Sequence, residues 1–165
     1  MLAKQGNPLA ADEKIHIIGI GDDGLEGLTS RARQLVERAE LLIGAEQALA
    51  RVAPGRAERL PLGSNLDEAI DRISRGKNKR IIVLASGDPL FYGIARYLCD
   101  RLGKDRFEVV PHVSSMQMAF ARVKESWEEA YLTNLANHSL EHVSTRSAAL
   151  RRRACSQPKI VRPSG

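Results

Sequence analysis

Short apolar runs alternate five times with segments of helical periodicity between residues 14 and 123. The first run is apolar at nearly every position, which is typical of a strand buried on both faces of a parallel sheet. The intervening segments place apolar residues three and four positions apart, as helices that cover a sheet do. The alternation predicts an α/β fold, with one parallel sheet and right-handed crossovers. The predicted strands span residues 14–20, 41–44, 59–62, 80–85 and 107–110.

Polar residues mark the expected beginnings of three helices. Thr29 or Ser30 is a suitable N-cap for a helix over residues 28–39, and Asn65 for a helix that ends at Gly76. Ser114 or Ser115 is suitable for a helix that runs through residue 123.

Loops of small residues follow the first, fourth and fifth predicted strands, where ligands of parallel sheets bind. The first loop contains Gly19, Gly21 and Asp22, and its glycines permit a sharp turn and close approach of a ligand to the backbone. A tight turn without a ligand explains these residues equally well, because they lack the G-x-G-x-x-G spacing of a dinucleotide site.

The second loop is a stronger candidate for a binding site. Gly87 permits close approach to the backbone, while Pro89 restricts φ and removes a donor, so the loop is rigid and exposed. Asp88 either accepts hydrogen bonds from amino or hydroxyl groups of a ligand or caps the next helix. In the third loop Ser114 and Ser115 offer hydroxyls and amides, with helix capping as the alternative.

Composition and charge exclude several classes of protein. The chain of 165 residues has the size of one domain, and its longest apolar stretch, residues 81–85, is far shorter than the ~20 residues that span a bilayer. Residues 1–12 lack the apolar centre of a signal peptide, so we expect a cytoplasmic protein. Cys99 and Cys155 are expected to be free thiols. His138 and His142 have a spacing suited to zinc, but no third ligand is evident, so no metal site is predicted.

The basic charge is concentrated near the C-terminus. The net charge is +5, yet all 20 acidic residues lie at or before Glu141, and six of the 25 basic residues follow it. The charge therefore predicts a solvated, disordered tail, with phosphate binding as the alternative, and it argues against nucleic-acid binding by the rest of the chain.

Three segments, in this order, resemble the tetrapyrrole methylase family: IIGIG at residues 17–21, LASGDPLFYG at 84–93, and VSSMQMAFAR at 113–122 followed by Trp127. Within the family they are most similar to the branch of precorrin-6Y C5,15-methyltransferases and cobalt-precorrin-7 C5-methyltransferases of cobalamin biosynthesis. The resemblance extends from about Lys14 to Leu135.

The resemblance implies a homodimeric methyltransferase that binds S-adenosylmethionine between two domains and methylates a carbon of a precorrin. It also implies a separate partner for the decarboxylating methylation of this branch. No catalytic residue is assigned, because the sulfonium methyl is already activated and alignment does most of the work. The resemblance assigns cofactor binding to Gly87, Asp88, Pro89, Ser114 and Ser115, and substrate binding to Gly19, Gly21 and Asp22.

The chain departs from the family pattern at two places. Asp22 and Asp23 stand where the family has Pro and then Gly, and residues 133–138 replace a segment of the Ser-x-His-Gly-Arg kind. The resemblance implies that most of the C-terminal domain is missing, so the alternative is a catalytically incompetent fragment or an interaction module that keeps the methylase fold.

The resemblance and the sequence pattern together divide the chain into four parts. They are a flexible N-terminus (1–13), the α/β domain (14–125), a linker with the start of a truncated second domain (126–145), and a basic tail, disordered or non-native (146–165). One further strand is expected at residues 129–135 and a helix at 139–153. Trp127, Tyr131 and Leu132 are the predicted anchors of a homodimer contact.

Overall fold

The computed structural model describes residues 14–63, 66–76, 79–128 and 130. The chain divides into two compact units, Met1–Val123 and Lys124–Gly165, and only residues 124–128 and 130 of the second are described. The strand and helix expected at 129–135 and 139–153, the Asn65 cap, and His138, His142, Tyr131 and Leu132 lie outside the described residues.

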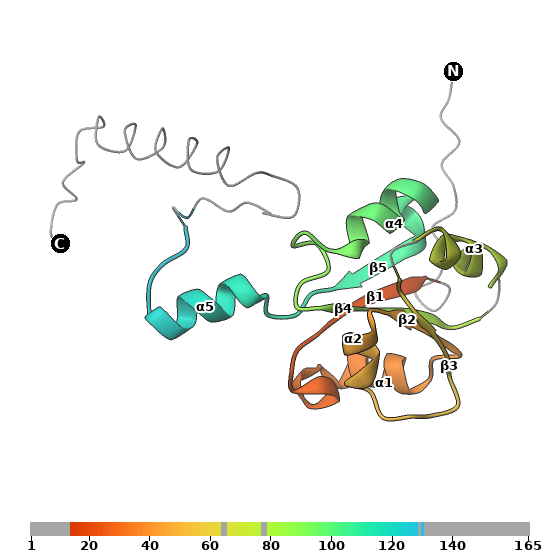
Figure 1. Cartoon of the computed structure of the whole chain (residues 1–165), viewed down its shortest axis with the longest axis horizontal. Coiled ribbons are helices and arrows are strands. Elements are labelled where there is room, and N and C mark those ends of the chain that lie inside the picture. The colour runs from red at the N-terminus through yellow and green to blue at the C-terminus, as the bar shows by residue number, and fades with distance from the viewer. Residues whose placement is uncertain (1–13, 64–65, 77–78, 129, 131–165) are drawn as a thin grey trace, which may run out of the picture. The chain divides into compact units, whose positions relative to one another are not determined.

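Five parallel strands form one sheet in the order β3-β2-β4-β1-β5 (Figure 1). The predicted parallel α/β fold is therefore confirmed, with β3 beginning one residue earlier than expected and β1 and β4 each beginning one residue later. The strands are β1 (Ile15–Ile20), β2 (Leu41–Gly44), β3 (Glu58–Pro61), β4 (Ile81–Ser86) and β5 (Phe107–Val110).

Helices connect the strands. Thr29 caps the first of them, because its Oγ1 accepts a hydrogen bond from the Ala32 amide at 3.2 Å, so this helix is shorter than the predicted range 28–39. Within the described residues no helix is both long and apolar enough to cross a membrane. The α-helices are α1 (Ser30–Glu37), α2 (Glu46–Ala50), α3 (Asp67–Arg75), α4 (Ile94–Leu102) and α5 (Ser115–Val123), and the 3₁₀ turns are η2 (Gly24–Gly27) and η3 (Lys104–Arg106).

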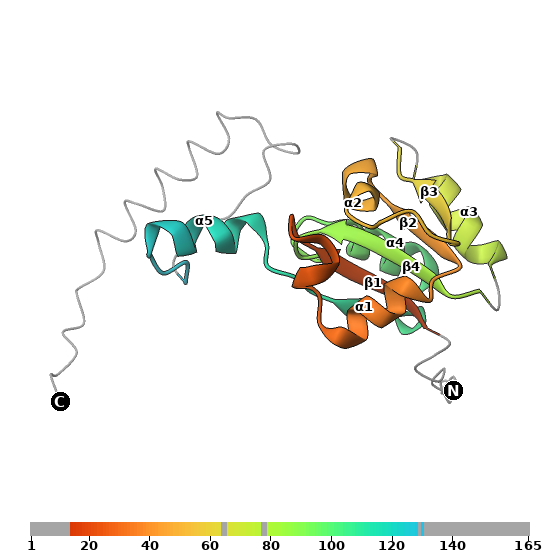
Figure 2. The same cartoon turned by 90° about the horizontal axis from the view of Figure 1, so that it is seen from below.

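The sheet has a separate hydrophobic core on each face. Successive residues of a strand point to opposite faces, so Ile18 of β1 packs with α1 and α2, while its neighbour Ile17 packs with α3 and α4. Both side chains are fully buried. Figure 1 shows α3 and α4 above the sheet, and Figure 2 views the sheet from the side that α1 and α2 cover.

The order of the strands reverses direction between β1 and β4, which are neighbours. From β1 the chain proceeds through α1 and α2 toward β3, whereas from β4 it proceeds through α4 toward β5 at the other edge. The connections that leave β1 and β4 therefore run to opposite faces of the sheet. Parallel sheets bind ligands in the crevice that such a reversal opens at the carboxyl ends of the strands.

Candidate functional site

The three small-residue loops meet at the carboxyl edge of the sheet. Gly19 of β1 lies in register with Ala85 of β4, and the Gly87 amide donates a hydrogen bond to the Ile20 carbonyl at 3.0 Å. A Cβ at Gly19 would lie 2.7 Å from the His112 amide nitrogen and closer still to the Gly87 carbonyl oxygen. The backbones of the three loops thus touch at Gly19, where there is no room for a side chain.

Gly87 joins the second loop to the third. Its φ of +66° lies in the left-handed region that favours glycine, and a Cβ there would lie 3.2 Å from the Ser114 Cα. The sequence placed both residues at one edge of the sheet, and the structure brings their backbones into contact.

Asp88 forms a turn within its own loop instead of capping a helix. Its Oδ1 accepts a hydrogen bond from the Leu90 amide at 2.8 Å, while α4 begins only at Ile94 and has no side-chain cap. The capping alternative for Asp88 is therefore wrong, because four residues separate Pro89 from α4. Pro89 is buried, contrary to the prediction of an exposed loop, and its carbonyl accepts from the Ala95 amide at 3.2 Å, which anchors the loop to the helix.

Ser114 is the residue that caps α5. Its Oγ accepts from the Gln117 amide at 3.2 Å, and its own amide and hydroxyl donate to the Gln117 side-chain oxygen at 2.9 and 3.0 Å. This is a reciprocal capping box, and it leaves Ser114 buried with its hydroxyl engaged. Ser115, in contrast, is exposed at the first residue of the helix.

Arg51, which the sequence reasoning missed, bridges the first two loops. It lies at the end of α2 and donates hydrogen bonds to Asp22 and, at 3.3 Å, to the Ser86 hydroxyl. Asp22 itself is exposed, so the ion pair is formed at the surface. The partners are 29 and 35 residues away in sequence, and no local pattern signals such a contact.

His112 covers the first loop from the side of β5. Its Nε2 lies 3.9 Å from the Asp23 carboxylate, and a Cβ at Gly21 would lie 2.7 Å from its Cε1. Its Nδ1 is buried and has no hydrogen-bond partner among the described residues. Gly21 therefore makes room for this imidazole, and no signal in the local sequence pointed to the pair.

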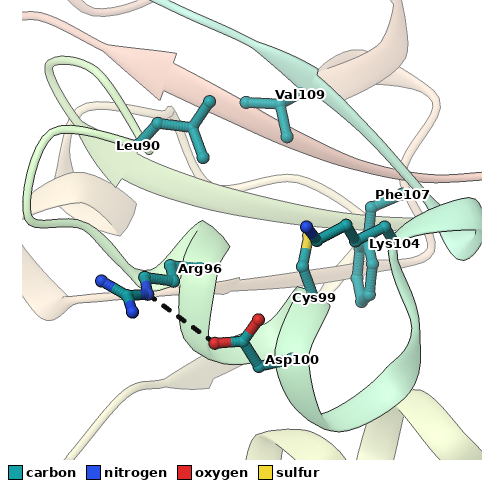
Figure 3. Close-up of a pocket in the computed structure, with 7 residues that line it drawn as sticks. All are labelled: Leu90, Arg96, Cys99, Asp100, Lys104, Phe107 and Val109. Atoms are coloured by element: carbon teal, nitrogen blue, oxygen red, sulfur yellow. Dashed lines mark ion pairs between the residues drawn. The ribbon is translucent and has the colours of Figure 1, made fainter.

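A cavity of about 570 Å³ lies beside this edge, between α4 and β5 (Figure 3). It shares only Leu90 with the second loop. Across the described parts of the chain, no group of three or more His, Cys, Asp or Glu side chains is placed to hold a metal ion. The lining residues are Leu90, Arg96, Cys99, Asp100, Lys104, Phe107 and Val109.

Comparison with known proteins gives consistent similarities. Residues 14–161 match the profile of the Tetrapyrrole (Corrin/Porphyrin) Methylases. A probable cobalt-precorrin-7 C(5)-methyltransferase of Methanocaldococcus jannaschii is 35% identical over 126 residues, which cover 73% of this chain and 59% of that protein. The chain thus spans less than two thirds of that relative's length.

Comparison with solved structures gives the same result as comparison of the sequences. A precorrin-6Y methylase of cobalamin biosynthesis from Archaeoglobus fulgidus superimposes with a TM-score of 0.59 and 30% identity, over 71% of this chain and 62% of that one. A uroporphyrin-III C-methyl transferase from Thermus thermophilus, complexed with S-adenyl homocysteine, superimposes with a TM-score of 0.52 and 25% identity, over 64% of this chain and 47% of that one.

Proposed function

This chain belongs to the tetrapyrrole (corrin/porphyrin) methylase family, and from that premise we propose that it acts in the S-adenosylmethionine-dependent C-methylation of a precorrin in cobalamin biosynthesis. The observation that carries the proposal is the convergence of three glycine- and serine-containing loops at the strand-order reversal, where backbones touch without intervening side chains. We place the reaction in the cytoplasm.

The second and third loops are the proposed cofactor side of the crevice. The left-handed backbone at Gly87 and the absence of a side chain there let the second loop pack directly against the backbone of Ser114, so both loops present their polar groups at one place. Asp88 accepts one local hydrogen bond through Oδ1, and its Oδ2 is suited to the hydroxyl or amino groups of the cofactor. Pro89 and Ser114 position the backbone, and Ser115 offers an exposed hydroxyl. When bound, S-adenosylmethionine supplies an activated methyl group, so these residues need only bind and orient it.

The first loop is the proposed substrate side. At Gly19 and Gly21 there is no room for a side chain, so this loop packs closely against its neighbours. Asp22 is held by Arg51, whose other contact is with Ser86 at the end of β4. Arg51 is therefore a positioning residue that connects the substrate loop to the strand that precedes the cofactor loop.

We include a homodimer in this proposal, together with a separate partner for the decarboxylating methylation. Exposed large apolar side chains support a subunit contact, and six are found among the described residues. Trp127, 46% exposed, is one of them and remains the candidate anchor. Sedimentation tests this part: a monomer at tens of micromolar would contradict it. The six are Leu90, Tyr92, Val113, Met118, Val123 and Trp127.

Calorimetry with S-adenosylhomocysteine tests the cofactor site. We expect heat of binding from the full chain, and loss of that heat when Asp88→Ala is combined with Pro89→Ala. The matched control is Glu37→Ala, at an exposed carboxylate at the end of α1, which is expected to leave binding unchanged. Undiminished binding by the double variant would mean that the cofactor binds elsewhere on the protein.

A turnover assay separates the enzyme from the second candidate, a module that keeps the fold without methyl transfer. Both candidates keep the methylase fold, so the transfer of the methyl group is what distinguishes them. Incubation with a late precorrin and methyl-labelled cofactor should transfer the label to the tetrapyrrole. Folded protein that binds the cofactor product but transfers no label would favour the module.

A further inference from the structure

The cavity between α4 and β5 has a mostly apolar lining at the open edge of the sheet. Among the described residues β5 is the edge strand, so its side chains Phe107 and Val109 have α4 on one flank and no further described strand beyond them. Leu90 contributes a third apolar side chain (Figure 3). The volume of about 570 Å³ is within the range of sites for small organic ligands, which are typically lined by apolar groups with a few polar ones.

The polar groups of the cavity leave one positive charge unbalanced. Arg96 pairs with Asp100, with 3.7 Å between Nε and Oδ2, so these two charges compensate each other. Within the described residues no carboxylate lies at ion-pair distance from the Lys104 ammonium, which acts electrostatically on the Cys99 thiol. Burial, and then Asp100, raise the pKa of the Cys99 thiol while Lys104 lowers it, so the thiol is neutral at physiological pH. The lining therefore complements an anion with an apolar body.

Leu90 also connects the cavity to the Asp88 loop. Its side chain lines the cavity, and its amide donates the 2.8 Å hydrogen bond to the Asp88 carboxylate. The side chain is 60% exposed and so is free to change position when something occupies the cavity. Such a change would move the amide that holds Asp88.

We propose that this cavity is a second ligand site, which binds a small aromatic anion through Lys104 and the apolar floor, and that its occupancy is coupled through Leu90 to the Asp88 loop. In this arrangement the carboxylate or sulfonate of the ligand lies at Lys104, and its flat body contacts Phe107, Val109 and Leu90. The binding part is independent of methyl transfer, whereas the effect of the coupling on cofactor affinity rests on the proposed function.

Fluorescence titration with 8-anilinonaphthalene-1-sulfonate, an aromatic anion, tests the binding part on the full chain. Lys104→Gln is expected to weaken binding about tenfold, since a hydrogen-bonded charge contact is lost. Lys79→Gln is the matched control, because Lys79 is an exposed lysine that lies 3.9 Å from Glu58 and does not line the cavity. Equal affinities of the two variants would overturn the site, because the probe would then be bound to some other apolar surface.

Protection of Cys99 locates the probe. In a Cys155→Ser chain, Cys99 is the sole thiol, and its alkylation by iodoacetamide should slow at saturating probe. An unchanged rate while the probe is bound would place the probe outside the cavity and overturn the proposal.

Amide hydrogen exchange at Leu90 tests the coupling without using the cofactor. Saturating probe should change the exchange rate of this amide, and Lys104→Gln should abolish the change at the same probe concentration. Protection of Cys99 with no change at Leu90 would refute the coupling. Neither Cys99 alkylation nor Leu90 amide exchange involves S-adenosylhomocysteine. A failure of the proposed cofactor site would therefore be recognised separately, because the unmodified chain would then show no heat of binding with S-adenosylhomocysteine.

Discussion

Substitution of Gly19 by alanine is expected to destabilise the protein by forcing the three loops of the candidate site apart. The new Cβ would lie 2.7 Å from the His112 amide nitrogen and 2.8 Å from the His112 Cβ, and closer to the Gly87 carbonyl. Carbon atoms pack favourably at ~3.5–4.0 Å, so the neighbouring backbone must move by about 1 Å. β1 cannot yield instead, because Ile18 and Ile20 on either side are fully buried. Overpacking typically costs ~1–3 kcal/mol, and backbone obstruction on two sides places Gly19→Ala at about 3 kcal/mol.

Equilibrium unfolding in urea, followed by circular dichroism, measures this cost directly. Two other glycines separate the possible causes. Gly103 has a φ of +90° and nothing within 4 Å of its Cβ position, so Gly103→Ala is expected to cost about 1 kcal/mol through backbone strain alone. Gly55 has open space and no positive φ, so Gly55→Ala should change the free energy of unfolding by less than about 0.5 kcal/mol. If Gly19→Ala were as stable as Gly55→Ala, the inferred contact among the three loops would be refuted.

Three further predictions concern the helices. Ser114→Ala should lower the free energy of unfolding by about 1 kcal/mol, because it removes the capping hydroxyl of α5, whereas Ser115→Ala should have little effect; equal costs in urea unfolding would count against the capping box. Leu98→Ala should cost ~2–5 kcal/mol, because this side chain of α4 is fully buried, and a value near zero would mean that α4 does not pack as described. Asp100→Asn removes a carboxylate that raises the pKa of the Cys99 thiol, so the pH midpoint of Cys99 alkylation, measured with Cys155 replaced, should fall; a rise would contradict the assigned electrostatics.

The sheet was predictable because its strands are distinguished by local composition. β1 and β4 are apolar over nearly their whole length, and every residue of β1 is buried. The ends of the individual strands were less predictable. For example, β3 begins at Glu58 because that residue lies in register with Leu41 of β2. A register contact of this kind is set by the neighbouring strand, and the local sequence does not reveal it.

The candidate site was predictable only to the level of its loops. Glycine and proline signal backbone conformation locally, so Gly87 and Pro89 could be singled out from the sequence. Side-chain contacts across the loops could not be predicted from the sequence, because Arg51 contacts Asp22 only after α2 has folded onto the sheet. The role of Asp88 was open for the same reason, because its partner depends on whether α4 begins at once or, as observed, at Ile94.

The order of the strands explains why the crevice and the cavity are neighbours. The reversal between β1 and β4 marks the carboxyl edge at which we propose the crevice, and the connection that leaves β4 must then cross β1 through α4 to reach β5 at the end of the sheet. That single connection begins with Asp88 at the crevice, continues through Leu90, and lines the cavity with Cys99 of α4. A displacement of α4 relative to β5 therefore acts on the loop of Asp88 through covalent connection as well as through the Leu90 hydrogen bond. For this reason a ligand that wedges between α4 and β5 is expected to alter the crevice even without touching a residue of the first or third loop.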